Sequence, residues 1–222
     1  MVLTLVLARS IGALAGVAVA ALVVLAIGLM RTQSRQVRAA LAILAILAVA
    51  ITAGIAAAKL GGNDASITVR AATLRIGLAA VQERPWLGFG TNGFAHESAR
   101  IERALFGREL VELHPTNQPF SAHDAYMNVA VERGLGALVA FLGLLTVIVV
   151  SGLRRSARIP DVDRDMLVVG LLAGVVAFAA QAMTENLFSF SKVSTIFWIM
   201  AAGLVSLTSR DGEAAPMTAK AS

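Results

Sequence analysis

A histidine and three further polar side chains gather just ahead of a long apolar run. His123 and Asp124 are followed by Tyr126, and Glu132 closes the polar stretch before the apolar run begins near Gly134. Histidine is the side chain whose ordinary pKa lies nearest to neutral, so His123 is the candidate general base. We predict that His123 is catalytic, at the mouth of a membrane-spanning helix, and that Asp124, Tyr126 and Glu132 support it.

The sequence around His123 has the features of a helix start. Ser121 and Asp124 have the S-x-x-D spacing of a capping box, so we predict that Ser121 begins the helix that becomes the third span. The positive end of that helix would disfavour an imidazolium, keep His123 in its neutral form and favour a nearby phosphate. The alternative is that His123 is a polar side chain at the membrane interface. For Asp124 we favour a capping role.

Three arginines form a second candidate group, because Arg9, Arg70 and Arg75 fall on the same predicted side of the membrane. Guanidinium groups bind phosphate oxygens bidentately and stay charged at neutral pH. On a regular helix Arg70 and Arg75 are about 140° apart, so we expect them to lie on different faces. The alternative for each arginine is snorkelling toward lipid headgroups.

A glycine-rich stretch at 88–93 matches the G-x-G-x-x-G of dinucleotide sites. That motif is meaningful only between the strand and the helix of a βαβ unit, whereas here it follows a predicted helix and Pro85. We therefore interpret the stretch as a turn that places Trp86 and Phe89 at the membrane interface.

The composition indicates an integral membrane protein. Hydrophobic residues make up 57% of the chain, charged residues make up 15%, and the mean hydropathy is +0.76. Such long apolar runs predict an all-α, polytopic membrane helical bundle. The absence of cysteine excludes disulfides and Cys-based zinc sites. Because the excess positive charge lies in short segments between apolar runs, we attribute it to membrane orientation and predict no nucleic-acid partner.

Five membrane spans can be drawn, at roughly 10–30, 38–58, 134–153, 166–186 and 193–208. Arginines cluster in two short loops that should face the cytoplasm: Arg31, Arg35, Arg38, Arg154, Arg155, Arg158 and Arg164. The predicted organisation is two transmembrane helices in 1–58, an outer helical loop with the active-site motifs in 59–133, three transmembrane helices in 134–208, and a disordered cytoplasmic tail in 209–222. We expect further spans upstream of residue 1.

The outer loop should be largely helical. We predict one helix from Asn63 or Asp64 to about Arg84, ended by Pro85 and lying on the membrane surface. A second, amphipathic helix is predicted at 95–112, with a break at 114–119.

Small residues and one carboxylate suggest contacts between helices. The glycine pairs Gly12/Gly16 and Gly170/Gly174 have the small-xxx-small spacing of close helix packing. Glu185, at the predicted end of a span, is expected to form interhelical hydrogen bonds rather than to react.

The order of these motifs resembles the O-antigen ligase and polymerase superfamily. The resemblance rests on Arg9 with Ser10-Ile11-Gly12, on Arg70 fifteen residues before Pro85-Trp86-Leu87-Gly88-Phe89-Gly90, and on His123-Asp124-Ala125-Tyr126 with Glu132 and Gly134. It covers roughly residues 3–150 and corresponds to the C-terminal half of longer members. Leu74 stands where many members have tryptophan, and Asp124 stands where Asn or Ser is frequent.

The resemblance implies a GT-C-like fold and a membrane glycosyltransferase of the bacterial inner membrane. Such an enzyme moves a glycan from an undecaprenyl-pyrophosphate donor to a hydroxyl on a glycan, glycolipid or protein, with inversion, at the periplasmic or extracellular face. No metal, nucleotide or other cofactor is implied. The resemblance assigns Arg9, Arg70 and Arg75 to the donor pyrophosphate and His123 to catalysis.

Two other functions remain open from the sequence. One is a non-catalytic subunit that binds or assembles lipid-linked glycans in a polysaccharide export system. The other is a transporter fragment, which is disfavoured because the sequence shows neither a broken span with central charges nor an obvious inverted repeat.

Overall fold

The computed structural model describes residues 11–31, 34–36, 39–40, 42–43, 65–107, 122, 124–156 and 162–209, and this part of the chain contains helices and turns but no strand. Its elements are α2 (Ile11–Arg31), α4 (Ala65–Glu83), α5 (Gly93–Phe106), α6 (Ala125–Ser156), α7 (Val162–Gln181), the 3-10 turn η2 (Leu187–Ser189) and α8 (Ser191–Ser209). The all-α prediction is confirmed. The predictions for Arg9, His123, the break at 114–119, the tail from 210 and almost all of the span at 38–58 fall outside the described residues.

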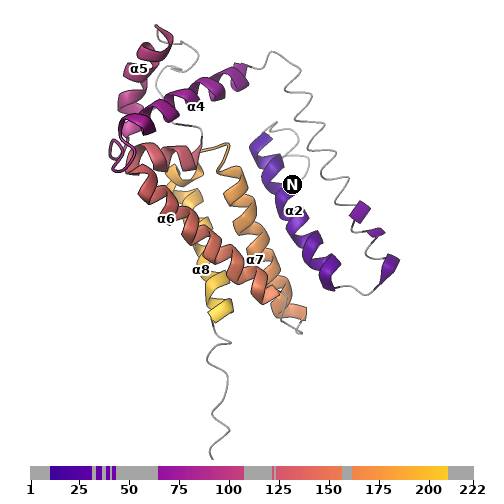
Figure 1. The fold of residues 1–222 in the computed structure, drawn as a ribbon. Helices are drawn as coiled ribbons and strands as arrows, with labels where there is room; N and C mark the ends of the chain where they lie inside the picture. Colours follow the sequence, from indigo (N-terminus) through magenta and orange to yellow (C-terminus); the bar gives the residue numbers. More distant parts are fainter. Residues whose placement is uncertain are drawn as a thin grey trace, which may run out of the picture.

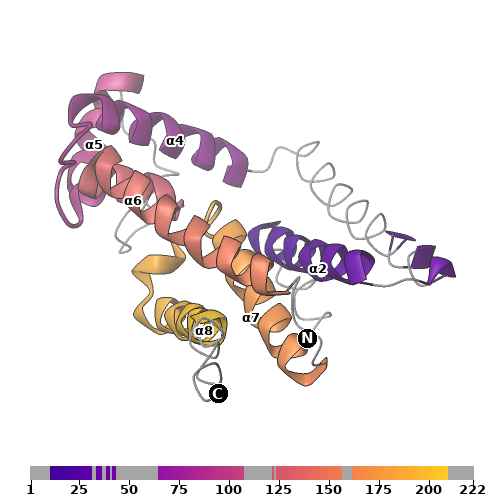
Figure 2. The same ribbon diagram turned by 60° about the horizontal axis from the view of Figure 1, so that its bottom comes forward.

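The helices form two groups. α2, α7, α8 and the long second part of α6 run side by side, and we call them the bundle (Figure 1). α4, α5 and the start of α6, residues 125–133, form a second group at one end of the bundle, which we call the outer assembly (Figure 2). The start of α2 lies at the same end as the outer assembly, whereas the ends of α2 and α6 lie at the opposite end (Figure 1).

The bundle has an apolar core of its own. Its buried residues include Leu172 and Val175 of α7 and Phe197 and Leu204 of α8. Phe188 of η2 packs edge-on against Phe197, with ring centroids 5.1 Å apart. Within the described residues, α6 and α8 are long and apolar enough to cross a membrane, and α2 and α7 carry the shorter apolar stretches Ala15–Leu29 and Met166–Gln181. These elements fit a helical membrane bundle.

Small residues bring α2 against α7, as predicted for the first glycine pair. Gly12 lies so close to Thr184 that a Cβ there would collide with its hydroxyl, and a Cβ on Gly16 would lie 2.8 Å from the Ala177 carbonyl oxygen. The second predicted pair is wrong as a pair. Gly174 packs on Met200 of α8, but Gly170 has open space around it.

Two of the predicted helix ends need correction. α7 ends at Gln181 and not at 186, because the carbonyl groups of Ala182 and Thr184 turn away to accept hydrogen bonds from α6 and α4. α5 ends at Phe106 and not at 112, because Gly107 adopts the left-handed conformation (φ 70°) and donates its N–H to the Arg103 carbonyl. α4 ends at Glu83, just before Pro85, as predicted.

A second apolar core holds the outer assembly together. Ile76 of α4, Phe94 and Ile101 of α5, and Val131 of α6 are almost fully buried against one another. The opposite face of α4 leaves Leu74 and Leu78 exposed. Their exposure is compatible with the predicted position of α4 on a membrane surface, which stays a prediction.

Candidate functional site

A break in α6 marks the border between the outer assembly and the bundle. Gly134 has non-helical backbone angles (φ 84°, ψ 171°) inside an otherwise continuous 32-residue helix. A helix of that length extends for about 48 Å, well beyond the roughly 30 Å of a hydrocarbon core. We therefore place the start of the membrane-spanning part after the break, which leaves the charged Glu132 and Arg133 outside it.

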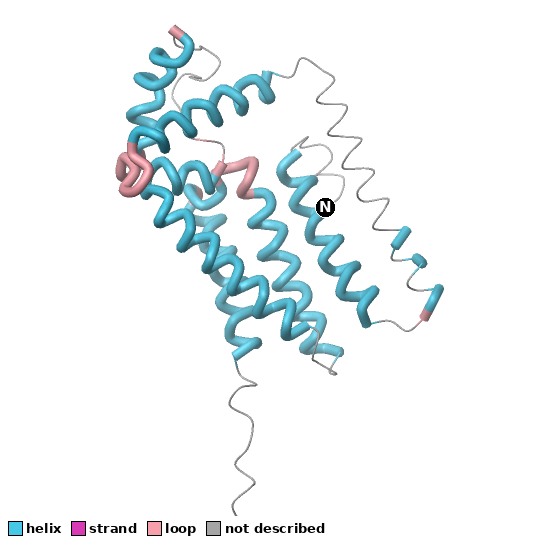
Figure 3. Tube along the Cα trace, in the orientation of Figure 1, coloured by secondary structure: helices cyan, strands magenta, loops and turns pink. Residues whose placement is uncertain are grey.

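The 85–90 turn fills the gap that this break leaves in the helix. Leu135 donates its N–H to the Pro85 carbonyl at 2.7 Å, instead of to the carbonyl four residues earlier. The released carbonyl groups of Val131 and Glu132 accept the N–H groups of Phe89 and Gly90, each at 2.9 Å. Figure 3 shows this turn folded against the start of α6. The glycine-rich stretch is therefore a turn, as predicted, and its backbone forms hydrogen bonds with the α6 groups left unpaired at the break.

The two aromatic residues of this turn have different surroundings. Trp86 is exposed (74%), as an interfacial anchor would be. Phe89 instead packs on the apolar core of the outer assembly, and the Arg84 guanidinium lies 4.9 Å from its ring centroid. Phe89 is therefore half-buried in the protein, and the position of both side chains at a membrane interface stays a prediction.

The start of α6 is capped by Asp124. The Asp124 Oδ1 atom accepts the backbone N–H groups of Tyr126 at 2.8 Å and Met127 at 3.2 Å. Burial raises the pKa of Asp124, while these two donors act in the opposite direction. The predicted capping role of Asp124 is confirmed. The predicted helix start at Ser121 is wrong, because Asp124 caps a helix that begins at Ala125.

Tyr126 fastens the start of α6 to α7. Its hydroxyl donates a hydrogen bond to the Ala179 carbonyl at 2.8 Å, and its ring lies near Phe141, with centroids 6.0 Å apart. The backbone N–H of Ala125 also donates to the Ala182 carbonyl at 2.9 Å. The residues that follow His123 in the chain are thus held against the end of α7.

Arg70 reaches the same region from α4. Its Nη1 donates to the Thr184 carbonyl and its Nη2 to the Glu185 carboxylate, both at 3.0 Å. The two side chains remain about one third exposed, at 38% for Arg70 and 34% for Glu185. Glu185 bonds to another helix, as predicted, but it does so from the turn after α7 and not from within a helix, and its partner is a predicted site residue.

Arg75 points elsewhere. It is exposed, and no ion pair joins it to any residue that the structure describes. The prediction that Arg70 and Arg75 lie on different faces of the helix is confirmed. Their common assignment to one phosphate site is an untested prediction.

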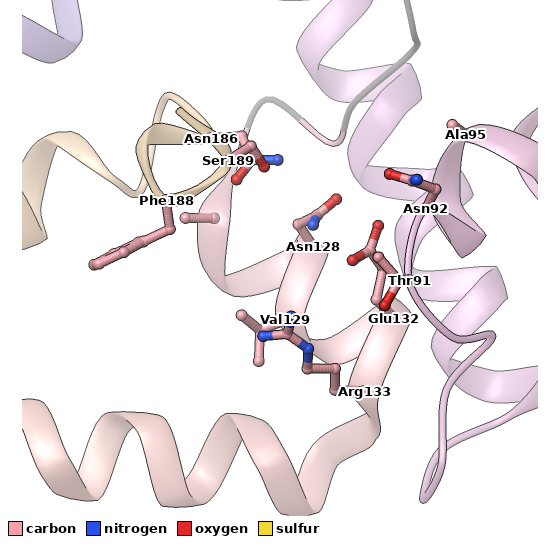
Figure 4. Close-up of a pocket in the computed structure, with 11 residues that line it drawn as sticks. Thr91, Asn92, Ala95, Asn128, Val129, Glu132, Arg133, Asn186, Phe188 and Ser189 are labelled. Carbon is pink, nitrogen blue, oxygen red and sulfur yellow. The ribbon is translucent and has the colours of Figure 1, made fainter. Parts of the chain in front are cut away.

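A pocket of about 350 Å³ opens beside the start of α6. Its walls come from the 91–95 segment, the first turns of α6 and the 186–189 turn (Figure 4). The lining residues are mostly polar: Thr91, Asn92, Ala95, Ala125, Asn128, Val129, Glu132, Arg133, Asn186, Phe188 and Ser189.

Glu132 is the carboxylate in this pocket. Burial raises the pKa of Glu132, and hydrogen bonds from the Asn128 side chain and the Asn92 backbone oppose that shift. Of the predicted site residues that the structure describes, Glu132 lines the pocket, Asp124 adjoins its wall residue Ala125, and Arg70 contacts Glu185 next to its wall residue Asn186.

Sequence reasoning missed the asparagines of the pocket. Asn128 lies four residues before Glu132, a spacing that places both side chains on one helix face and that could have been noticed. Asn92 and Asn186 carry no comparable signal, because only the folded chain brings them near α6.

Comparison with known protein families identifies the family of this chain. The sequence profile described as O-antigen ligase matches residues 1–142, well over half of the chain. The chain belongs to the O-antigen ligase family. Comparisons with curated proteins and with solved structures gave no match.

The O-antigen ligase match covers α2, α4, α5 and the first part of α6. It therefore includes all the residues predicted to act in the site, whereas α7 and α8 lie beyond it. Membership in the O-antigen ligase family supports a role in glycan transfer at a membrane, with lipid-linked glycan and acceptor substrates in general.

Proposed function

We propose that this protein is an inverting glycosyltransferase that moves a glycan from an undecaprenyl-pyrophosphate donor to a hydroxyl acceptor. Transfer takes place at the outer face of the bacterial inner membrane. Arg9, Arg70 and Arg75 bind the donor pyrophosphate, and His123 is the general base. Asp124, Tyr126 and Glu132 support this site.

One observation supports the convergence of Arg70 with the segments that carry Arg9 and His123. The 182–186 turn contacts Arg70 directly, contacts Gly12 three residues after Arg9, and accepts the N–H of Ala125 two residues after His123. Segments that are far apart in the sequence thus meet at one turn. We propose that the donor binds beside this turn.

The state of Arg70 suits an anionic ligand. Its contacts with Thr184 and Glu185 use one hydrogen bond on each terminal nitrogen, so the guanidinium retains further donors for phosphate oxygens. A partly exposed ion pair of this kind contributes only about 0–1 kcal/mol, so Arg70 can change partners at little cost. The Thr184 carbonyl keeps the side chain extended toward the turn.

In the proposed reaction the acceptor oxygen attacks the anomeric carbon as His123 takes its proton. The bond between that carbon and the pyrophosphate oxygen breaks, and the arginines stabilise the negative charge on the departing lipid pyrophosphate. General-base assistance contributes about 10²–10⁴-fold. Electrostatic stabilisation by preorganised donors contributes about as much for each donor, so we expect the arginines to matter at least as much as the base.

The test measures glycan transfer from lipid-linked donor in membrane vesicles that contain the full-length protein. We expect His123→Ala and Arg70→Ala each to lower turnover at least about 10²-fold, with normal membrane insertion. The matched control is Arg100→Ala, because Arg100 is also an outer-assembly arginine paired with carboxylates but lies away from the 182–186 turn. Full turnover by His123→Ala would remove its proposed role. Donor binding without transfer to any acceptor would instead favour a non-catalytic binding subunit.

A further inference from the structure

The pocket beside α6 has the composition of a site for a neutral polar ligand. Three carboxamides, from Asn92, Asn128 and Asn186, line it, and Figure 4 shows that they come from three separate segments. Each carboxamide offers both a hydrogen-bond donor and an acceptor. Adjacent hydroxyl groups on a ring need that combination, because each hydroxyl also donates and accepts.

The charges in the pocket disfavour a phosphate. Glu132 places a carboxylate on the wall, and Arg133 provides one cation beside it, so the local charge is balanced. An anion would meet that carboxylate at close range, whereas a hydroxyl can donate to it. Glu132 and Asn128 lie on one face of α6, so together they define the direction from which a ligand hydroxyl can form hydrogen bonds with both.

The asparagine at the far wall is nearly buried and follows an anchored residue. Asn186 is only 6% exposed, and it follows Glu185, whose carboxylate is bound by Arg70. On the near wall, Asn128 and the Asn92 backbone both donate to Glu132. The Arg70–Glu185 pair thus anchors the turn next to Asn186, and the near wall is joined through Glu132. Little ordering of these two segments would be needed when a ligand binds.

We propose that this pocket binds a neutral sugar ring, with Asn128, Glu132 and Asn186 as the residues that recognise its hydroxyl groups. The inference rests on the proposed function and specifies where the glycan part of a substrate lies. The cavity is at the small end of the range for ligand sites, about 300–1,000 Å³, which suits one or two rings and not a long glycan. The ring can belong to the donor or to the acceptor, because both carry the same hydroxyl chemistry.

A binding measurement tests the pocket independently of catalysis. The full-length protein in lipid nanodiscs is titrated with methyl glycosides of glucose, galactose, N-acetylglucosamine and rhamnose, observed by saturation-transfer NMR. We expect at least one glycoside to bind. Asn128→Ala and Asn186→Ala should each weaken its binding about 3- to 10-fold, the usual effect of losing one neutral hydrogen bond. Gln82→Ala, which removes an exposed carboxamide outside the pocket, should leave binding unchanged.

The outcomes separate this inference from the proposed function. If no glycoside binds, or if both asparagine variants bind as well as the parent protein, the sugar site is overturned even when transfer activity is present. If a glycoside binds through these asparagines but no transfer occurs, the pocket stands and the glycosyltransferase proposal fails.

Kinetics then identify the source of the ring. A rise in KM for the lipid-linked donor in Asn128→Ala assigns the pocket to the donor sugar, and a rise in KM for the acceptor assigns it to the acceptor. Unchanged KM values for both substrates, in a variant shown to be folded by its thermal transition, would contradict a role for the pocket in either substrate.

Discussion

The outer assembly and the bundle are stabilised by different kinds of contact. In the outer assembly, loop and helix exchange backbone hydrogen bonds around Gly134, an aspartate caps α6, and ion pairs join Glu83 and Glu97 to Arg100. In the bundle, apolar side chains and small residues meet over long parallel surfaces. Irregular backbone is tolerated only where its polar groups have partners. The candidate site lies on the border between the two regions, where irregular backbone with paired polar groups adjoins closely packed helices.

The largest expected difference concerns the two apolar cores. Phe94→Ala in the outer assembly should lower the free energy of unfolding by about 3–5 kcal/mol, because a buried ring is lost from a core that we expect to form in contact with water. Phe197→Ala in the bundle should cost only about half as much, because lipid provides no hydrophobic driving force between helices. Equilibrium unfolding in mixed micelles measures both variants. Equal losses of unfolding free energy in the two variants would mean that the hydrophobic effect stabilises both regions to the same extent.

The break in α6 supplies the next prediction. Gly134→Ala should destabilise the outer assembly by about 3 kcal/mol, because a side chain at this positive φ is strained and its Cβ would collide with the Trp86 carbonyl. Gly143→Ala is the matched control, since a Cβ there meets open space within the bundle part of α6. Limited proteolysis between α4 and α6 should accelerate in Gly134→Ala alone. Equal protection of both variants would show that α6 can straighten without loss.

A smaller effect is expected at the start of α6. Asp124→Ala should cost about 1 kcal/mol, the usual effect of losing a helix N-cap, whereas Asp124→Asn should stay within a few tenths of the parent protein. Thermal unfolding of the three proteins side by side provides the measurement. A large loss in Asp124→Asn would mean that the charge of Asp124, and not its oxygen acceptor, holds the helix start.

The smallest effect concerns the exposed ion pairs of α5. The hydrogen bond from Arg100 lowers the pKa of Glu83. Any stability from this pair is therefore present above the ordinary pKa of the carboxyl and is lost as the pH falls through the lowered value. Arg100→Ala should return the Glu83 titration, followed by carboxyl NMR shifts, to its ordinary range without a measurable change in thermal stability. A clear loss of stability would show that the pair contributes more than exposed pairs usually do.

Local chemistry allowed part of this structure to be predicted from the sequence. Pro85 fixes the end of α4, Asp124 caps α6, and Gly12 with Gly16 predicts a close helix contact. Each of these inferences depends on a residue type and its immediate neighbours. The resemblance to the O-antigen ligase family rested likewise on short motifs in a fixed order, and the family match over residues 1–142 confirms it.

The rest depends on partners that are distant in the sequence. The Arg70–Glu185 pair joins residues 115 positions apart, and the early end of α7 follows from carbonyl groups that bond to other helices. Gly134 is visible in the sequence, but the sequence does not show that the 85–90 turn replaces the hydrogen bonds that the helix loses there. The pocket asparagines come from three separate segments, so no local pattern could have assembled them.

The 182–186 turn performs much of its task with main-chain atoms. The backbone carbonyl oxygens of Ala182 and Thr184 accept hydrogen bonds from the Ala125 N–H and the Arg70 guanidinium, respectively. Every amino acid supplies such a carbonyl group. Mutations could therefore accumulate in this stretch while its contacts persist, provided that the side chain at 184 still fits against Gly12.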